Sequence, residues 1–514
     1  MSAVSSGGTA VLSVPKVTVE VDGHELPVPT AAALGPVRVR YEVSTPSVCE
    51  VDLAAPSGSL QLTHGQALTL RLEGASRELF EGEVVAIRHH LGPDGTHRVV
   101  LRGFDRSHRL RQNAPIRTMT DLTVADLVQA VAGDYGLGVD AETPGPRLPR
   151  VIQQGQSDLD LVSRLVAEAG LWWQLDQDQD QLRLSSWRPS GDLRRLTWGE
   201  DLLEVTVASD ATAATDSVRA LGWDPVERAV WDVTATGAQG GASVAAQLDR
   251  LGGSGERVQA GRIWASTDQA EGSARAELEA RARAAVTLRA VVRGDAEWRP
   301  GDLLQIEGVD TDLAGPHQIT MVEHLVDAVS GYVCILAAED PPTPAVPTQS
   351  RSATVLALAE VVDVEDPDLA GRVRVRLPAL DGMETEWLPV MALGAGRDKG
   401  LLCQPDNGDT VVLLQPADDP GRGVVLGGLF AGTLPAEAAG VSERAVRRFS
   451  FATPDGQRML LNRDGDAVVI SNAAGSRIEM TADAVLLHSE ANLTVEAPGR
   501  RLLFRAQTID FERG

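Results

Sequence analysis

Five short apolar runs alternate with clusters of Gly, Pro, Asn and Asp in one stretch of the chain, between residues 361 and 430. The runs cover residues 373–377, 387–391, 401–403, 411–414 and 424–429. In the first run, Val373, Val375 and Leu377 alternate with arginines, as expected for a half-buried strand. Short strands at this spacing, separated by turn residues, predict a small closed barrel of five strands.

Two turns in this stretch have a clear chemical signature. Asp366 and Pro367 open a turn that ends at Gly371 and redirects the chain into the strand 372–376. Residues 405–409, PDNGD, supply the residues with positive φ that a tight hairpin requires. Both turns fit a barrel of the OB type.

The N-terminal part of the chain carries longer strand patterns and two amphipathic helices. The strand patterns cover residues 17–21, 37–43, 68–72, 79–89 and 97–102, and predict one antiparallel barrel. Helical spacing covers residues 122–132. A second helix starts after Ser157, which can cap it together with Asp160, and stops at Gly170. A hairpin of strands 171–175 and 181–185 should follow it.

The last segment, 449–514, consists of short apolar alternations interrupted by turns. Its inward positions are predicted to be Val485, Leu487, Leu493 and Val495, with His488 facing outward. One copy of such a thin meander cannot enclose a core, because both faces and both edges stay exposed. Three copies wrapped around one axis would close it into a needle. This pattern therefore predicts a trimeric C-terminal spike.

The ordered pieces of the barrel segment resemble a known family: the VgrG proteins of type VI secretion and the central hub and spike proteins of contractile phage tails. The residues of the chain that match the OB-fold motif are Asp366, Pro367, Gly371, Trp387, Gly400, Pro405, Gly408, Asp409 and Gly427. The helix after Ser157 and the aromatic pair Trp172 and Trp173 are also similar to that family. The resemblance covers about residues 17 to 430 and is sharpest in the barrel.

Pattern and resemblance together predict a mainly β protein with a few helices, built from a two-barrel hub domain, an OB-fold barrel and an intertwined trimeric β-helical spike. The predicted boundaries are a flexible N-terminus (1–15), the tube-docking hub (16–340), a proline-rich linker (341–352), the OB-fold domain (353–435), a second linker (436–448) and the spike (449–514).

The resemblance implies a structural role at the baseplate centre of a bacterial contractile injection system, where the chain caps the inner tube and punctures the target envelope. Implied partners are two further copies of the chain, an Hcp-like inner tube protein, a PAAR-type tip protein, baseplate wedge components and, on firing, the target membrane. We expect the trimer interface at Val485, Leu487, Leu493, Val495 and Phe504. We expect the tip-docking surface at Ile509 and Phe511. Assembly is expected in the cytoplasm, within a contractile particle that is either retained or released.

Charge limits the other functions that an OB barrel could have. The 514 residues carry 72 acidic and 47 basic side chains, a net charge of −25. Nucleic-acid affinity depends largely on basic residues, so this balance argues against a nucleic-acid partner. Cys49, Cys334 and Cys403 all lie in apolar surroundings and are expected to be buried reduced thiols. No signal peptide or apolar run of membrane-spanning length is found.

We find no catalytic motif, and no cofactor, metal site or catalytic residue is predicted. The adjacent His89 and His90 should point to opposite faces of a strand and cannot chelate one ion together. Trp172 and Trp173 are interpreted as one core ring and one interface ring. Two alternatives stay open: a glycan- or nucleic-acid-binding OB-domain protein, and a spike enzyme that carries an effector activity.

Overall fold

A computed structural model of the chain describes residues 14–26, 34–54, 62–93, 95–186, 193–212, 214–224, 229–238, 255–259, 267–309, 314–339, 354–397, 399–416, 422–431 and 440–512. The predicted linker 341–352 and most of the predicted flexible N-terminus lie outside these residues. Two compact units are formed, one by residues 1–407 with 412–426 and the other by 408–411 with 427–514. The predicted domain boundaries stay a prediction.

The first unit starts with a run of antiparallel strands. They are β1 (Val17–Val21), β2 (His24–Glu25), β3 (Leu34–Glu42), β4 (Thr45–Ala54), β5 (Ala67–Leu72), β6 (Phe80–Leu91) and β7 (His97–Phe104). These strands enclose a core of alternating residues such as Val37, Val39, Leu70 and Leu101, none of which is exposed to solvent. Strand β4 was not anticipated from the sequence.

A helical subdomain follows. It contains η2 (Arg106–Arg111), β8 (Ile116–Thr123), α1 (Val124–Gly133), β9 (Gly138–Ala141), β10 (Arg147–Gln154), α2 (Asp158–Glu168), β11 (Leu171–Asp176) and β12 (Gln181–Ser186). The predicted cap is confirmed, because the Ser157 side chain accepts a hydrogen bond from the Asp160 backbone N–H. Trp173 of β11 is fully buried in the core that β11 shares with α2, and Trp172 packs against Val43.

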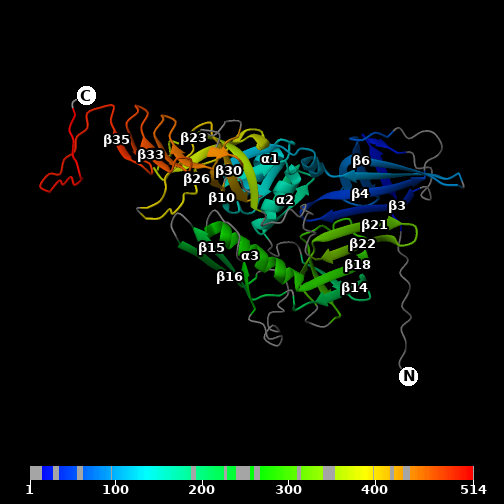
Figure 1. Cartoon of the computed structure of the whole chain (residues 1–514). Helices are drawn as coiled ribbons and strands as arrows, with labels where there is room; N and C mark the ends of the chain where they lie inside the picture. Colours follow the sequence, from blue (N-terminus) through cyan, green and yellow to red (C-terminus); the bar gives the residue numbers. More distant parts are fainter. Residues whose placement is uncertain are drawn as a thin grey trace, which may run out of the picture. The chain divides into compact units, whose positions relative to one another are not determined.

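The chain up to residue 338 then adds four strands to the first sheet and forms two further three-stranded sheets. The elements of this part are β13 (Leu193–Thr197), β14 (Leu202–Ser209), β15 (Ser217–Asp224), β16 (Ala229–Thr236), β17 (Glu256–Gln259), α3 (Thr267–Ala284), β18 (Val286–Arg293), β19 (Leu303–Glu307), β20 (His317–Gln318), β21 (Met321–Asp327) and β22 (Gly331–Ala338). Strands β14, β18, β21 and β22 are the four that join the first sheet. Helix α3 lies along β15 and β16, and β21 lies beside β3 (Figure 1).

This pairing of β21 with β3 changes the predicted topology. The N-terminal strands do not form a separate sheet, since they belong to one continuous sheet with the order β14-β18-β22-β21-β3-β4-β7-β6-β5-β1-β2. A second apolar core, which includes Leu288, Leu304, Val322 and Leu336, lies under the β18–β22 side. Two cores thus share one sheet, which joins segments about 300 residues apart in sequence.

The barrel consists of β23 (Thr354–Asp363), β24 (Arg372–Leu377), η4 (Pro378–Leu380), β25 (Met383–Glu384), β26 (Leu388–Pro389), β27 (Thr410–Pro416) and β28 (Val424–Leu429). Strands β25, β24, β23, β27 and β28 pair in this order, while β26 pairs with β24. Val390 forms a bridge with Val425 of β28, so the circuit of strands closes. Inward residues such as Val373, Val375 and Val411 are fully buried.

The predicted run 401–403 is not a strand. Leu401 and Leu402 are 42% and 79% exposed, and Cys403 is exposed, so the expectation of three buried cysteines is wrong for this one. Strand β23 is the fifth strand of the barrel instead. The side chains of its first half, including Leu356 and Leu358, are exposed, so the strand lacks the regular apolar–polar alternation of a half-buried strand.

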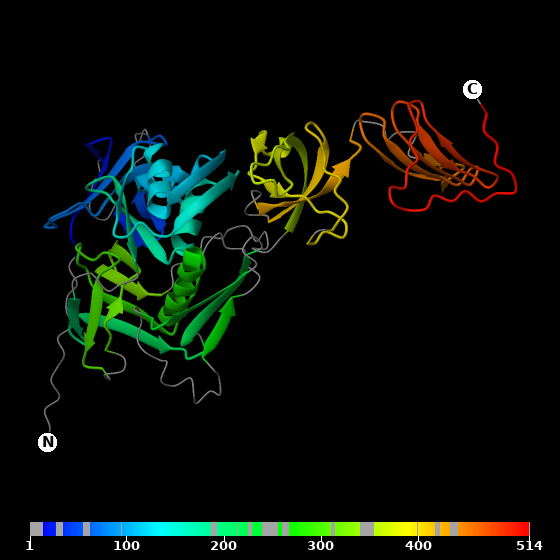
Figure 2. The same cartoon turned by 90° about the vertical axis from the view of Figure 1, so that its left-hand side faces the viewer.

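The C-terminal unit contains β29 (Val441–Ser442) and β30 (Ala445–Val446), then a meander of β31 (Arg448–Ala452), β32 (Arg458–Asn462), β33 (Ala467–Ser471), β34 (Arg477–Met480) and β35 (Val485–His488). The five strands of the meander pair in sequence order, like successive rungs (Figure 2). Residues 489–512 contain no strand. The fold is mainly β, as predicted.

Candidate functional site

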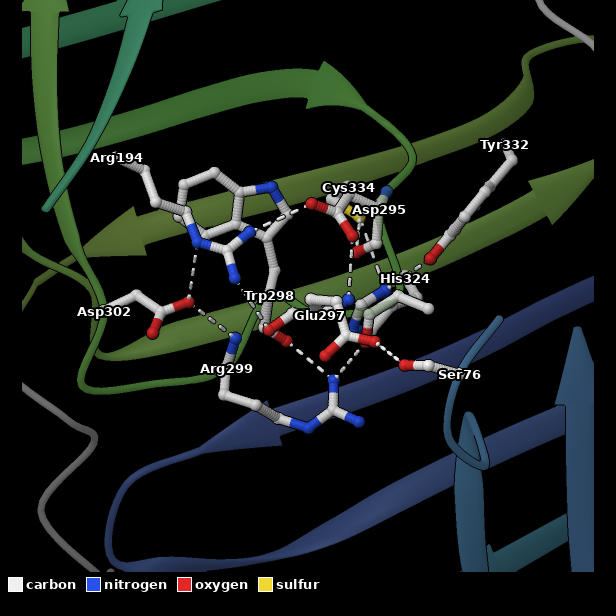
Figure 3. Close-up of polar contacts among 11 residues, drawn as sticks. Ser76, Arg194, Asp295, Glu297, Trp298, Arg299, Asp302, His324, Tyr332 and Cys334 are labelled. Carbon is white, nitrogen blue, oxygen red and sulfur yellow. Dashed lines mark hydrogen bonds and ion pairs between the residues drawn. The ribbon is translucent and has the colours of Figure 1, made fainter. Parts of the chain in front are cut away.

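A cysteine and a histidine side chain contact each other on the neighbouring strands β21 and β22 (Figure 3). His324 on β21 and Cys334 on β22 are direct cross-strand partners, and both are fully buried. Cys334 Sγ lies 3.3 Å from His324 Nδ1, and Tyr332 Oη lies 3.0 Å from the same nitrogen. The backbone N–H of Asp295 points to Cys334 Sγ at 3.5 Å. A cysteine beside a histidine can act as a nucleophilic dyad, and the protonation states of the two side chains decide whether this pair does.

Two arginines surround this cluster. Arg299 Nη1 donates to the carbonyl oxygens of Ala296 and Trp298, at 2.7 and 2.8 Å, and the guanidinium lies 4.5 Å from the ring centre of Tyr41 on β3. Arg194 stacks on Trp298 at 4.3 Å. These contacts tie the loop 294–302 to strand β3 and thus join the two halves of the hub sheet.

The electrostatics of the pair exclude a thiolate nucleophile. Burial raises the pKa of the Cys334 thiol to about 11. Burial, with the positive charge of Arg299 as the smaller contribution, lowers the pKa of His324 to about 3. A reactive cysteine needs the opposite shifts, a depressed thiol pKa beside a protonated or proton-accepting imidazole, together with access for substrate. Both side chains are neutral and enclosed in the folded protein, which is not the state of a nucleophilic dyad.

This buried histidine should make hub stability depend on pH. A histidine of the unfolded chain titrates near pH 6.5, whereas His324 in the folded hub titrates only near pH 3. Between these values the unfolded chain binds more protons, so the free energy of unfolding should fall as pH decreases, by about 1 kcal/mol per pH unit. Denaturant unfolding at several pH values, followed by the fluorescence of the hub tryptophans, measures this change in the free energy of unfolding.

The matched variants are His324→Leu and His64→Leu, of which His64 is exposed. His324→Leu should unfold with a shallower dependence on pH between 6.5 and 4 than the unchanged protein, while His64→Leu should keep the original dependence. Equal slopes in all three proteins would show that His324 is not held neutral by burial.

A second candidate site is one face of the C-terminal meander. Strand register places two rows of five side chains on this face, and every one of them is apolar. The first row is Phe449, Leu461, Val468, Met480 and Val485, and the second is Phe451, Met459, Ile470, Ile478 and Leu487. We call these ten residues the apolar face. Nine of them are between 38% and 74% exposed, so the described residues of this unit do not cover them.

The opposite face is mixed. Its outer row consists of Ala452, Arg458, Ser471, Arg477 and His488. His488 Nε2 lies 2.8 Å from Glu490 Oε1 on this side, which is the orientation that the sequence pattern predicts. The two faces therefore differ: the mixed face carries charged and polar side chains among apolar ones, whereas the apolar face carries no polar side chain and suits an apolar partner surface.

The predicted interface residues do not all lie together. Val485 and Leu487 belong to the apolar face. Leu493, Val495 and Phe504 are 56%, 54% and 64% exposed and follow the last strand, in a segment without pairing. The predicted tip residues Ile509 and Phe511 are 49% and 93% exposed. The sequence pattern predicted only Val485 and Leu487 of the apolar face and missed its other eight members. Their alternation with polar residues from Phe449 onward is the signal that could have identified them.

In the barrel, the predicted motif residues form turns. The Asp366 carboxylate accepts hydrogen bonds from the backbone N–H groups of Asp368, Ala370 and Arg372, and from the Arg372 side chain. The Arg372 guanidinium, the largest contribution, and these N–H groups hold the pKa of Asp366 well below its usual range. Gly371 has φ of +71°, which favours glycine.

The other motif residues lie in loops, turns or strand ends, except Gly427, which lies within β28. Pro405 is buried, Trp387 is half-buried, and Pro367 and Asp409 are exposed. Gly400, Gly408 and Gly427 all have positive φ. However, Gly408 does not close a tight hairpin, because no strand precedes it. No catalytic arrangement is found among these residues. In the part of the chain that the structure describes, no group of three or more His, Cys, Asp or Glu side chains could hold a metal ion.

The chain combines a β-rich domain with two apolar cores on one sheet, a closed barrel and a meander with an exposed apolar face. Residues 40–330 match the family described as phage tail baseplate hub (GPD), and residues 357–430 match the type VI secretion system/phage-baseplate injector OB domain. The chain belongs to the phage tail baseplate hub family. No curated protein sequence matches it.

Two solved structures share the fold. A component of the E. coli type VI secretion system, described as structurally similar to the bacteriophage T4 tail proteins gp27 and gp5, has 16% identity and a TM-score of 0.53 over 80% of this chain and 99% of the other. The Francisella PdpA–VgrG complex contains a chain with 9% identity and a TM-score of 0.54, over 93% of this chain and 88% of the other. No helix in the described ranges is long and apolar enough to cross a membrane.

Proposed function

We propose that three copies of this chain form the hub and spike at the baseplate centre of a contractile injection system, cap its inner tube and lead it through the target envelope. The observation that carries the proposal is the apolar face in a chain of the baseplate hub family. Ten apolar side chains on one face that the described residues of the C-terminal unit leave uncovered require a partner surface. Two further copies supply the same face, and three such faces can bury one another around a threefold axis.

The same proposal names the other partners. The hub docks on an Hcp-like inner tube protein and contacts baseplate wedge components, and the spike meets the target membrane on firing. Ile509 and Phe511, which are exposed beyond the last strand, offer an apolar surface to a PAAR-type tip protein. Assembly takes place in the cytoplasm, in a particle that is retained or released. The role is mechanical and not enzymatic, in keeping with the neutral, enclosed His324 and Cys334.

Imaging of native particles by electron microscopy tests this function. Particles with the full chain should show one copy of the spike, with threefold symmetry, at the end of the inner tube. Particles with a chain that lacks residues 449–514 should keep the hub at the tube end, because the hub folds around its own cores, but should lose the spike. Density for the chain elsewhere in the particle would contradict the proposal.

A further inference from the structure

The hairpin of β6 and β7 carries histidines near its tip. His89 pairs with Val99 in the strand register, and Leu91 pairs with His97. His89 and His97 are therefore diagonal neighbours on the same face of the hairpin. Nδ1 of His89 lies 3.1 Å from Nε2 of His97, and the two rings stack with their centroids 5.3 Å apart.

His90, the neighbour of His89 in sequence, lies on the other face. It pairs with Arg98, whose side chain forms an ion pair with Asp52. A positive charge beside His90 disfavours a bound cation there. The partner of His89 is therefore His97, eight residues away, and not the histidine next to it.

The separation of the two ring nitrogens fits chelation. Imidazole nitrogens bind Zn²⁺ at about 2.05 Å. Two such bonds that span the observed 3.1 Å enclose an N–metal–N angle of about 98°, which lies between the square-planar and tetrahedral values. In the metal-free pair one facing nitrogen donates its proton to the other. On binding, that proton moves to the outer nitrogen of the same ring, so both facing lone pairs become available.

We propose that His89 and His97 form a site for a divalent transition metal ion of the kind imidazole prefers: Zn²⁺, Ni²⁺ or Cu²⁺. The protein supplies two ligands, because the described residues offer no third His, Cys, Asp or Glu side chain to such a group. Water fills the remaining positions. His89 is exposed and His97 half-buried, so the ion exchanges with solvent and keeps open positions for a donor from another molecule.

Calorimetric titration of the full chain with Zn²⁺ tests the site. All variants carry Cys403→Ser, so that the exposed thiol does not compete. The Cys403→Ser protein should bind Zn²⁺ at one site per chain that His89→Asn and His97→Asn each weaken at least tenfold. His90→Asn is the matched control and should leave the affinity unchanged.

Three outcomes overturn the proposal: no Zn²⁺ binding at millimolar concentration, an unchanged affinity in His89→Asn or His97→Asn, or an equal loss in His90→Asn. Circular dichroism of each variant checks folding, which these substitutions at a hairpin tip should not alter. The result is independent of the proposed spike function, since the hairpin belongs to the hub.

Discussion

Ile470→Asp should dissociate the C-terminal spike. Ile470 lies on the central strand β33, between Met459 and Ile478 in the second row of the apolar face, and is 42% exposed in one chain. In the proposed trimer this position is buried three times around the axis. A carboxylate without a partner in an apolar interface costs several kcal/mol per copy, more than most interfaces can absorb.

Sedimentation equilibrium measures the outcome. The unchanged protein should sediment as a trimer, three times 54.5 kDa, and Ile470→Asp should raise the dissociation constant at least a hundredfold. The control is Ser471→Asp, on the neighbouring position of the same strand but on the mixed face, where Arg458 and Arg477 are its cross-strand partners. Ser471→Asp should sediment like the unchanged protein.

Hub contacts could keep some chains associated, and a chain that lacks residues 449–514 separates the two contributions. Ile470→Asp should associate no more strongly than this deletion variant. A monomeric unchanged protein at micromolar concentration would end the spike hypothesis, and so would an equal effect of Ile470→Asp and Ser471→Asp.

Trp173→Ala should produce the largest loss of hub stability. The ring is fully buried in the core of the helical subdomain, and Nε1 donates to Ser163 Oγ of α2 at 3.2 Å. Removal of a buried tryptophan side chain costs about 3–5 kcal/mol, through lost burial and the cavity left behind. It also leaves a buried hydroxyl without its donor. Denaturant unfolding followed by circular dichroism should report this loss.

Two control variants separate the effects of ring volume, hydrogen bond and burial on the free energy of unfolding. Trp173→Phe keeps much of the ring volume but not the hydrogen bond, so it should lose less than Trp173→Ala. Trp198→Ala removes a ring that is 47% exposed and should cost about 1 kcal/mol or less. If Trp198→Ala and Trp173→Ala lost the same free energy of unfolding, the core position assigned to Trp173 would be wrong.

Local patterns were the most reliable guide to the elements. The helix capped by Ser157 and the hairpin after it were predicted within a residue or two, because a cap, an amphipathic repeat and a terminal glycine are all encoded within a few positions. Three of the five predicted barrel strands, 373–377, 411–414 and 424–429, were placed correctly, 387–391 is a strand only at 388–389, and 401–403 is not a strand, while β23 and β25 were not predicted. At 401–403 an apolar run lies in an exposed loop, and no local signal distinguishes such a run from a strand.

Side-chain pairs that depend on strand register could not be predicted, even within one hairpin. His324 and Cys334 read as ordinary strand residues, and only the register of β21 on β22 makes them neighbours. His89 was compared with His90, whereas the β6–β7 register brings it to His97. Such contacts depend on register, and a shift of one residue would move every side chain to the other face.

The sequence by itself determined the class of protein, the main strands and helices, and the need of the last segment for a partner. The class follows from the resemblance to a known family, the strands and helices from short-range patterns, and the need for a partner from apolar positions that a single thin meander leaves exposed. Only the tertiary structure decided the single sheet that joins both ends of the hub, the neutral state of His324 and the composition of the apolar face. Each depends on pairing and burial between segments, and the free energy of those contacts has no local signature.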